Sequence, residues 1–221
     1  MRRFTCDDLE ARATFVELAA AAARRGELVV FPTDTVYAVA CDAFSPRATD
    51  RLNDAKQRSS DTALPVMVGS VRGLDALAAQ VTPEEKALVQ GCWPGPLTVV
   101  CKSQPTLQWD LGGSADSVAL RMPLHPLALA VLQAVGPMAV VTANRAGGPV
   151  PLDCDAAVEQ LGDTVSVYLD AGPCTTGPPS TIVDLREVQP RLLREGAVST
   201  ADLKSILPDL VVPGEEEMTS P

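Results

Sequence analysis

A short apolar segment, residues 27–31, runs directly into a turn that carries two threonines and one carboxylate, Thr33, Asp34 and Thr35. The segment has the length of a buried strand, and α/β proteins present functional side chains where such strands end. A plain strand exit is the alternative interpretation, because Asp34 and the threonines could simply satisfy local backbone groups. A functional role for this turn therefore needs support from other parts of the sequence.

Helical and strand-like patterns alternate along the chain, which is typical of α/β proteins. The predicted strands 97–101 and 118–121 follow one another without a helix between them, and so do 181–185 and 191–193, which favours a mixed sheet over a parallel one. The remaining predicted strands are 36–41, 64–68, 138–141 and 165–169. The predicted helices run from a cap near Asp8 to about residue 25, over 46–56, from a capping box at Thr82, over 127–135, from Asp153 to about 161, and from a cap at Ser199.

Length and composition indicate one folded domain. The chain has 221 residues, of which 46% are hydrophobic, enough for one sizeable core. We place this domain at residues 1–212 and predict a disordered acidic tail at 213–221. The net charge of −10 argues against a general nucleic-acid-binding protein, although it leaves room for a local basic cleft.

Hydropathy predicts a protein without a membrane partner. No apolar run reaches the roughly 18 to 20 residues of a membrane span, because the longest candidate, 126–143, is interrupted by Gln133 and by Gly136-Pro137. The first residues pass quickly to charged positions, without the apolar stretch of a signal peptide. We therefore expect a cytoplasmic protein.

Cysteine and histidine usage limits the metal and thiol chemistry. The six cysteines form no Cys-x-x-Cys pair and His125 is the only histidine, which argues against a structural zinc site. We predict no metal ligands in the chain, and free, mostly buried thiols. A cysteine–histidine nucleophile would require Cys41 or Cys92 to meet His125 in space.

Two more polar clusters follow the first turn along the sequence. Lys56-Gln57-Arg58 comes at the end of a predicted helix, and Thr142-Ala143-Asn144 closes a predicted strand. Lysine offers a phosphate chain one point charge, arginine offers a planar fork, and threonine and asparagine offer short hydrogen bonds. Each cluster alone also fits a simpler interpretation, a solvated helix end for the first and a turn for the second.

Taken in this order, the three clusters resemble the YrdC-like family of threonylcarbamoyl-AMP synthases, whose pattern is Pro-Thr-(Asp/Glu)-Thr-Val-Tyr-Gly, then Lys-x-Arg, then Ser-x-Asn. The resemblance spans about residues 15–206. The other matching segments are 93–98, Arg121-Met122-Pro123 with His125-Pro126, 180–184 and Arg194-Glu195-Gly196. This similarity implies a single α/β domain with a twisted mixed sheet, helices around it and an open concave cleft as the active site.

The resemblance also implies an activity, that of an L-threonylcarbamoyladenylate synthase. Such enzymes combine L-threonine, bicarbonate and ATP into threonylcarbamoyl-AMP and pyrophosphate, for the threonylcarbamoyladenosine modification of tRNA. Mg²⁺ is expected with the ATP, and the expected partners are downstream proteins that transfer the threonylcarbamoyl group, with a weak contact to tRNA. By this resemblance Lys56 and Arg58 are catalytic, the ATP-binding residues are Lys56, Arg58, Thr62, Thr98, Asn144 and Arg194, and the threonine-binding residues are Thr35, Lys102, Thr142 and Ser180, with Lys102 against the carboxylate.

The sequence departs from the family pattern at several positions. Ala38 stands in place of a glycine, Met67 in place of a common histidine, Thr142 in place of a serine and Glu195 in place of a proline. Two other functions therefore stay open, a paralogue that makes a carbamoyl-adenylate from another amine or carbamoyl donor in a biosynthetic pathway, and a non-catalytic RNA-binding module. The intact Lys-x-Arg pair speaks against the module.

Overall fold

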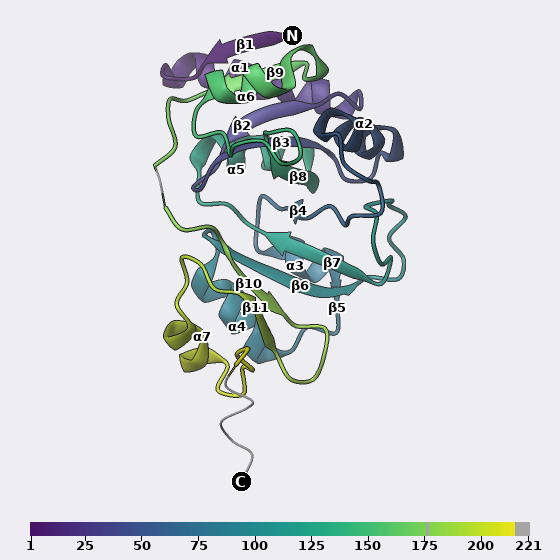
Figure 1. Ribbon diagram of the computed structural model, residues 1–221, viewed down its shortest axis with the longest axis vertical. Coiled ribbons are helices and arrows are strands. Elements are labelled where there is room, and N and C mark those ends of the chain that lie inside the picture. Colours follow the sequence, from purple (N-terminus) through teal and green to yellow (C-terminus); the bar gives the residue numbers. More distant parts are fainter. Residues whose placement is uncertain (176, 215–221) are drawn as a thin grey trace.

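The computed structural model describes residues 1–175 and 177–214, and it arranges them around one mixed sheet (Figure 1). Residues 215–221 of the predicted acidic tail lie outside the described residues. The strands are β1 (Arg2–Thr5), β2 (Val29–Pro32), β3 (Tyr37–Asp42), β4 (Val66–Met67), β5 (Ala78–Ala79), β6 (Leu97–Ser103), β7 (Ser117–Arg121), β8 (Met138–Thr142), β9 (Val167–Asp170), β10 (Thr181–Asp184) and β11 (Arg191–Arg194). The helices are α1 (Leu9–Arg24), α2 (Pro46–Lys56), α3 (Arg72–Leu77), α4 (Pro83–Cys92), α5 (Pro126–Val135), α6 (Cys154–Leu161) and α7 (Thr200–Ile206), and a short 3₁₀ helix, η1, covers Gly162–Thr164.

The strand order across the sheet is β1-β9-β2-β3-β8-β4-β7-β6-β10-β11, with β5 paired to β6 beside this path. β6 and β7 pair antiparallel, and so do β10 and β11, as the missing helices between them predicted. β1, β9 and β2 run parallel, as do β4 with β7 and β6 with β10. The prediction of an α/β domain with a mixed sheet is confirmed.

Helix starts follow the capping residues seen in the sequence. Asp8 accepts the backbone N–H of Glu10 at 2.8 Å at the start of α1. Thr82 and Glu85 form a reciprocal capping box at α4, and Asp153 accepts from Ala156 at 2.8 Å at α6. Each cap satisfies a backbone donor that the first helical turn leaves unpaired.

Two hydrophobic cores lie on opposite faces of the sheet, because alternate residues of a strand point to opposite sides. In β2, Val29 and Phe31 join one core together with α1 and α5, whereas Val30 joins the other together with α2, α4, α6 and α7. The strands of the sheet therefore tie both layers of helices into one unit. Figure 1 shows β1 near one end of the long axis and β11 with α7 toward the other.

Four elements were absent from the predictions, β1, α3, β5 and the short helix η1. β1 carries only one large apolar side chain, Phe4, and is held as an edge strand by parallel pairing with β9. α3 has six residues and β5 has two, which is too short for a periodic pattern to show. The predicted strand 64–68 is reduced to two residues in β4.

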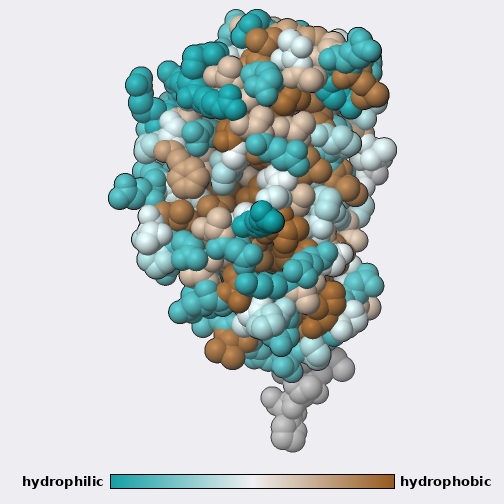
Figure 2. All heavy atoms as spheres, turned by 180° about the vertical axis from the view of Figure 1, so that it is seen from behind, coloured by the Kyte–Doolittle hydropathy of each residue, from teal (hydrophilic) through white to brown (hydrophobic). Residues whose placement is uncertain are grey.

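Apolar side chains are distributed over the surface without forming one large patch in the view of Figure 2. Large apolar residues that stay exposed are scattered, and Figure 2 shows hydrophobic and hydrophilic side chains interspersed over one face of the molecule. None of the helices in the described part of the chain combines the length and hydrophobicity that crossing a membrane requires.

Candidate active site

Thr33 stabilises the turn between β2 and β3 through its side-chain hydroxyl. Its Oγ1 accepts the backbone N–H groups of Thr35 at 3.2 Å and Val36 at 3.1 Å and donates to the Val36 carbonyl at 2.7 Å. Thr33 thus satisfies local backbone groups, as the simpler interpretation of this turn expected. The Asp34 side chain points toward Arg121, and Thr35 Oγ1 lies 3.1 Å from Thr33 Oγ1 and 3.4 Å from Arg121 Nη1.

Arg121 is a buried arginine beneath this turn, on β7. It donates from Nη2 to Asp34 Oδ1 at 2.7 Å and from Nε to the Gly95 carbonyl at 3.2 Å, whereas Nη1 makes only a long contact of 3.4 Å with Thr35 Oγ1. Burial lowers the pKa of Arg121, although the Asp34 carboxylate opposes that effect. In the sequence, Arg121 belongs to a segment that matches the family pattern, but the sequence alone did not indicate a role for it in the site. An arginine at the end of an apolar strand was the signal that could have identified it.

Lys56 is buried at the end of α2, with 6% of its surface exposed. Its ammonium group donates to the Thr142 carbonyl at 2.7 Å, to Thr142 Oγ1 at 3.2 Å and to Asn144 Oδ1 at 2.8 Å. Burial, assisted by the nearby Arg58 charge, lowers the pKa of Lys56 to about 8. The second and third predicted clusters therefore meet in space, and every donor of the ammonium group is in use.

Arg58 follows a sharp helix end, because Gln57 takes the left-handed conformation at φ 55°. The guanidinium group donates from Nη2 to the Thr62 carbonyl. Its Nε is buried and has no hydrogen-bond partner among the described residues. Burial lowers the pKa of Arg58. A buried cationic donor without a partner is costly, and an anionic ligand would supply the missing acceptor.

Ser180 is the centre of a third group, formed by the ends of β6, β10 and β11. Thr98 donates from Oγ1 to Ser180 Oγ at 3.1 Å. Arg194 donates to the Ser180 carbonyl at 3.0 and 2.8 Å and to Ser180 Oγ at 3.0 Å. Arg194 itself is exposed, while Ser180 and Thr98 are buried, so the arginine lies over the two hydroxyls.

The strand order brings the three groups together. Ala38 pairs with Thr142 across β3 and β8, which sets the first turn beside the Lys56 group. Thr98 pairs with Arg121 across β6 and β7, and side chains directly opposite one another in an antiparallel pair lie on the same face. Besides burial, the positive charge of Arg194 lowers the pKa of Arg121, as expected of two cations at the same site.

Two predicted residues lie apart from these contacts. Thr62 is exposed and meets Arg58 through its backbone carbonyl only. Lys102 is exposed at the far end of β6, four residues and therefore about 13 Å from Thr98. In the described part of the chain, Lys102 makes no hydrogen bond or ion pair with another predicted site residue. Arg121, not Lys102, is the cation next to Thr35.

The departures from the family pattern have local explanations. Ala38 is buried in β3 and has no positive φ, so its methyl group fits without strain. Glu195 accepts the backbone N–H of Thr200 at 3.0 Å and its hydroxyl at 2.7 Å, and so anchors the start of α7. Met67 lies in register with Arg121 across β4 and β7, next to the first turn.

The thiol and metal alternatives find no support in the geometry. All six cysteines are free, and burial raises the pKa of Cys41 to about 12, which disfavours the thiolate that a nucleophile needs. Nδ1 of His125 is buried with no partner within the described residues, and burial lowers the pKa of this histidine. Over residues 1–175 and 177–214, no group of three or more His, Cys, Asp or Glu side chains could hold a metal ion.

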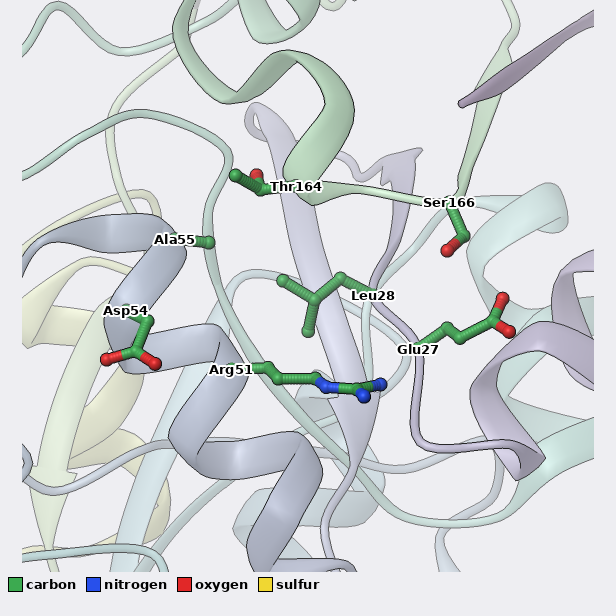
Figure 3. Close-up of a pocket in the computed structure, with 7 residues that line it drawn as sticks. All are labelled: Glu27, Leu28, Arg51, Asp54, Ala55, Thr164 and Ser166. Atoms are coloured by element: carbon green, nitrogen blue, oxygen red, sulfur yellow. The ribbon is translucent and has the colours of Figure 1, made fainter.

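A pocket of about 330 Å³ lies elsewhere, between α2 and the end of η1 (Figure 3). In Figure 3 the methyl groups of Leu28 lie at its centre and the Arg51 side chain runs along one edge. None of the predicted site residues lines it; the lining residues are Glu27, Leu28, Arg51, Asp54, Ala55, Thr164 and Ser166. The candidate active site is therefore not this pocket, and an open cleft over the three groups stays a prediction.

Comparisons with known proteins show the family to which the chain belongs. A family model for the Sua5/YciO/YrdC proteins, whose description reads "telomere recombination", matches residues 21–196. The putative threonylcarbamoyl-AMP synthase of Mycobacterium tuberculosis is 46% identical over 204 residues, which cover 92% of this chain and 94% of that protein. The threonylcarbamoyl-AMP synthase of Pyrococcus abyssi is 33% identical over 196 residues, which cover 88% of this chain and 58% of that protein.

The same relationship holds for solved structures. The crystal structure of P. abyssi Sua5 complexed with L-threonine superimposes with a TM-score of 0.89 at 30% sequence identity. The match covers 96% of this chain, which spans only 62% of the Sua5 chain. The chain belongs to the Sua5/YciO/YrdC family.

Proposed function

We propose that this protein is an L-threonylcarbamoyladenylate synthase, which condenses L-threonine, bicarbonate and ATP into threonylcarbamoyl-AMP and pyrophosphate for tRNA modification. The observation that carries the proposal is the buried, unpaired Arg58 Nε beside the Lys56–Thr142–Asn144 group, next to a turn that presents Thr35 above a buried arginine. The first feature suits a phosphate chain and the second suits a small amino acid. Relatives that carry the synthase name support this assignment.

For this reaction the protein must align the reactants and neutralise negative charge on the phosphates. The threonine amine and bicarbonate combine with loss of water to give a carbamate. A carbamate oxygen then attacks the α-phosphorus of ATP, and the bond from that phosphorus to pyrophosphate breaks. Arg58 and Arg194 would hold the triphosphate and stabilise the negative charge on the departing pyrophosphate. Lys56 would hold Thr142 and Asn144 in place for the nucleotide and add a positive charge nearby. Thr62 and Thr98 complete the proposed ATP contacts.

Arg121 is the better-placed partner for the threonine carboxylate. Among the described residues its Nη1 has only the 3.4 Å contact with Thr35 Oγ1, so this donor can meet a ligand carboxylate while Nη2 and Nε stay bound to Asp34 and Gly95. Thr35, Thr142 and Ser180 would then contact the remaining polar groups of threonine. Lys102 was expected in this role, but it lies four residues along β6 from Thr98, and it is Thr98 that stands opposite Arg121 and the turn at Thr35, so the geometry favours Arg121.

Mg²⁺ would enter with the nucleotide. In nucleotide sites this ion keeps several waters and binds phosphate oxygens with one or two carboxylates, so it needs no dedicated cage of side chains. That agrees with the lack of a three-ligand group in the described residues. Bound there, the ion would neutralise phosphate charge. We further propose cytoplasmic partners, namely proteins that transfer the threonylcarbamoyl group onward and a weak contact with tRNA.

A paralogue acting on another amine is the second candidate, and two side chains favour it. Met67 pairs in register with Arg121, the proposed partner of the substrate carboxylate. Thr142 is itself a proposed amino-acid contact, and it carries one methyl group more than the serine of the family pattern. A single methyl group discriminates between substrates by about 1 to 3 kcal/mol. Thr142→Ser should therefore change kcat/KM for threonine only modestly in a synthase, within that range at most, and should improve it in a paralogue.

The deciding experiment is pyrophosphate release with ATP and bicarbonate across a panel of amino acids. We expect turnover that depends on threonine, with serine and glycine poor. Fast turnover with threonine alone excludes the paralogue. No threonine-dependent turnover in either the wild type or Thr142→Ser overturns the synthase assignment.

A further inference from the structure

Behind the first turn, a connected set of hydrogen bonds begins at the first strand. Arg3, on β1, donates to Asp170 Oδ2 from Nε at 3.1 Å and from Nη2 at 2.6 Å. Asp170 ends β9, and its Oδ1 accepts the backbone N–H of Gly172 at 3.0 Å. Burial alone would raise the pKa of Asp170, but the hydrogen bonds from Arg3 and Gly172 outweigh burial and lower it. Asp170 is therefore a carboxylate at neutral pH, with both oxygens engaged.

Tyr37 joins this carboxylate to the segment that follows β9. Its side chain is wholly buried, and its hydroxyl lies 2.7 Å from the Gly172 carbonyl and 3.2 Å from Asp170 Oδ1, while Ala171 N donates to it at 3.2 Å. One phenolic proton serves one acceptor at a time, and the shorter distance favours the Gly172 carbonyl. Burial raises the pKa of Tyr37, so the hydroxyl remains a donor.

The segment 171–175 then runs against the turn of the candidate site. Cys174 donates its backbone N–H to the Leu152 carbonyl at 2.7 Å, and its Sγ lies 3.5 Å from the Thr33 carbonyl. Thr33 is the residue that folds the turn and so sets the position of Thr35. A continuous path of contacts thus leads from Arg3 through Asp170 and Tyr37 to the proposed amino-acid contacts.

We propose that Arg3 and Tyr37 are positioning residues for the amino-acid half of the active site. Acting through Asp170, they hold the segment 171–175 against the turn at Thr33, and this contact keeps Thr35 oriented toward the substrate. Neither residue is among the proposed contacts with ATP or threonine. The strength of the path comes from a charge-assisted pair whose carboxylate is only 14% exposed. The proposal rests on the proposed function for its kinetic consequence.

The kinetic test uses Arg3→Ala and Tyr37→Phe with two matched controls. Asp155→Asn removes the second partner of Arg3, which lies 2.5 Å from Nη1 but is 82% exposed and outside the path. Arg2→Ala removes the neighbouring exposed arginine. In pyrophosphate release we expect KM for threonine to rise about fivefold in Tyr37→Phe, as the loss of one hydrogen bond predicts, and at least as much in Arg3→Ala, which loses both hydrogen bonds to Asp170. In both variants kcat and KM for ATP should stay within about twofold of the wild type. Arg3→Lys keeps the charge and should fall between Arg3→Ala and the wild type.

Amide hydrogen exchange tests the same path without requiring activity. The amides of Ala171, Gly172 and Cys174 should exchange faster in Arg3→Ala and Tyr37→Phe, and at the wild-type rate in both controls. Unchanged exchange overturns the path, and faster exchange with an unchanged KM for threonine overturns its role in the site. Equal rises in KM for threonine and ATP together with a lower melting temperature would indicate a purely structural role. A wild-type protein that is inactive with threonine would refute the proposed function, while exchange would still decide whether the path exists.

Discussion

At the scale of single residues, burial decides what the basic side chains of the site can do. Lys56 and Arg58 are two positions apart, yet the first has acceptors for all three of its protons and the second keeps a buried donor without a partner in the described part of the chain. We therefore expect Lys56 to organise Thr142 and Asn144, and Arg58 to meet the phosphates directly. The two side chains differ in this way because Gln57, which lies between them, turns the chain sharply at the end of α2.

The pKa of Lys56 predicts an alkaline limit to activity. All three partners of its Nζ are acceptors, so the protonated form fits the site, and the pKa of about 8 implies that this form is lost as the pH rises above 8. The kcat/KM for ATP, which reports the free enzyme, should fall with an apparent pKa near 8, and the fall in kcat should come at higher pH because bound phosphates favour the ammonium form. The free energy of unfolding should change in the opposite direction. The pKa of Lys56 is lowered from its ordinary value of 10.5, so the unfolded chain binds more protons between pH 8 and 10.5, and the folded protein gains stability as the pH rises through that range.

A pH–rate profile checks this prediction, with Lys86→Ala as the control. Lys86 pairs with the exposed Asp75 on the protein surface and lies outside the candidate site. The control should keep the alkaline limb unchanged. A kcat/KM for ATP that stays level to pH 10 would show that the protonation state of Lys56 is irrelevant.

Arg58→Ala should abolish adenylate formation while the fold persists. A half-buried cation at the site contributes little to the core and much to phosphate binding, so we expect more than a tenfold loss of turnover, about 1.4 kcal/mol. Turnover and the urea midpoint should be measured for this variant and for Arg47→Ala, an exposed arginine of α2, the helix that precedes Arg58. Retention of more than a tenth of wild-type turnover would remove Arg58 from the principal phosphate ligands.

At the scale of elements, the segment after Arg58 is held by the loop between β6 and β7. Leu64 donates its backbone N–H to the Leu111 carbonyl at 2.7 Å. Gly112 has φ +70° and lies so close to the chain that an added Cβ would overlap the Ser60 carbonyl oxygen. The loop therefore packs tightly against residues 60–63, the segment whose Thr62 carbonyl accepts a hydrogen bond from the Arg58 guanidinium group.

Gly112→Ala should therefore weaken ATP binding as well as stability. The new methyl group must push the backbone at Ser60 away, which displaces the acceptor of Arg58, so KM for ATP should rise several-fold. Gly162→Ala is the matched control, because its φ of +48° is also positive but an added Cβ would meet nothing within 4 Å. That variant should cost about 1 kcal/mol of stability from backbone strain and leave KM for ATP unchanged. Equal kinetic effects in both variants would contradict the proposed contact.

At the scale of the whole molecule, one sheet carries both hydrophobic cores. Leu120 lies in the central strand β7 and is fully buried in the core formed with α2, α4, α6 and α7. Both tryptophans, Trp93 and Trp109, belong to or pack against this core. Because the strands are shared, we expect the two layers to unfold together.

Leu120→Ala should lower the free energy of unfolding by about 2 to 5 kcal/mol, the range for removing a buried leucine. Urea unfolding followed by tryptophan fluorescence and by far-ultraviolet circular dichroism measures the change, and the midpoints of the two signals should shift together. Leu193→Ala on β11, where the leucine is 54% exposed, should change stability by no more than about 0.5 kcal/mol. Separate midpoints for the two signals would mean that the cores unfold independently.

The sequence alone determined the features that depend on neighbours along the chain. Capping residues such as Thr82 and Asp153 act within one helical turn, so the starts of α4 and α6 were predictable. The mixed sheet followed from strands that succeed one another without room for a crossover helix. The polar clusters could be recognised because each of them is contiguous.

Only the tertiary structure decided which of these residues meet. The order β8-β4-β7-β6 sets Thr142, Arg121 and Thr98 on nearby strands although they are widely separated in sequence, and it leaves Lys102 at the far end of β6. That arrangement also decides that all three donors of the Lys56 ammonium group have acceptors, whereas Nε of Arg58 has none among the described residues. A side chain's partners and burial are set by long-range packing. Local patterns carry no information about strand order, which is why the buried Arg121 was not assigned its place beside Thr35 from the sequence.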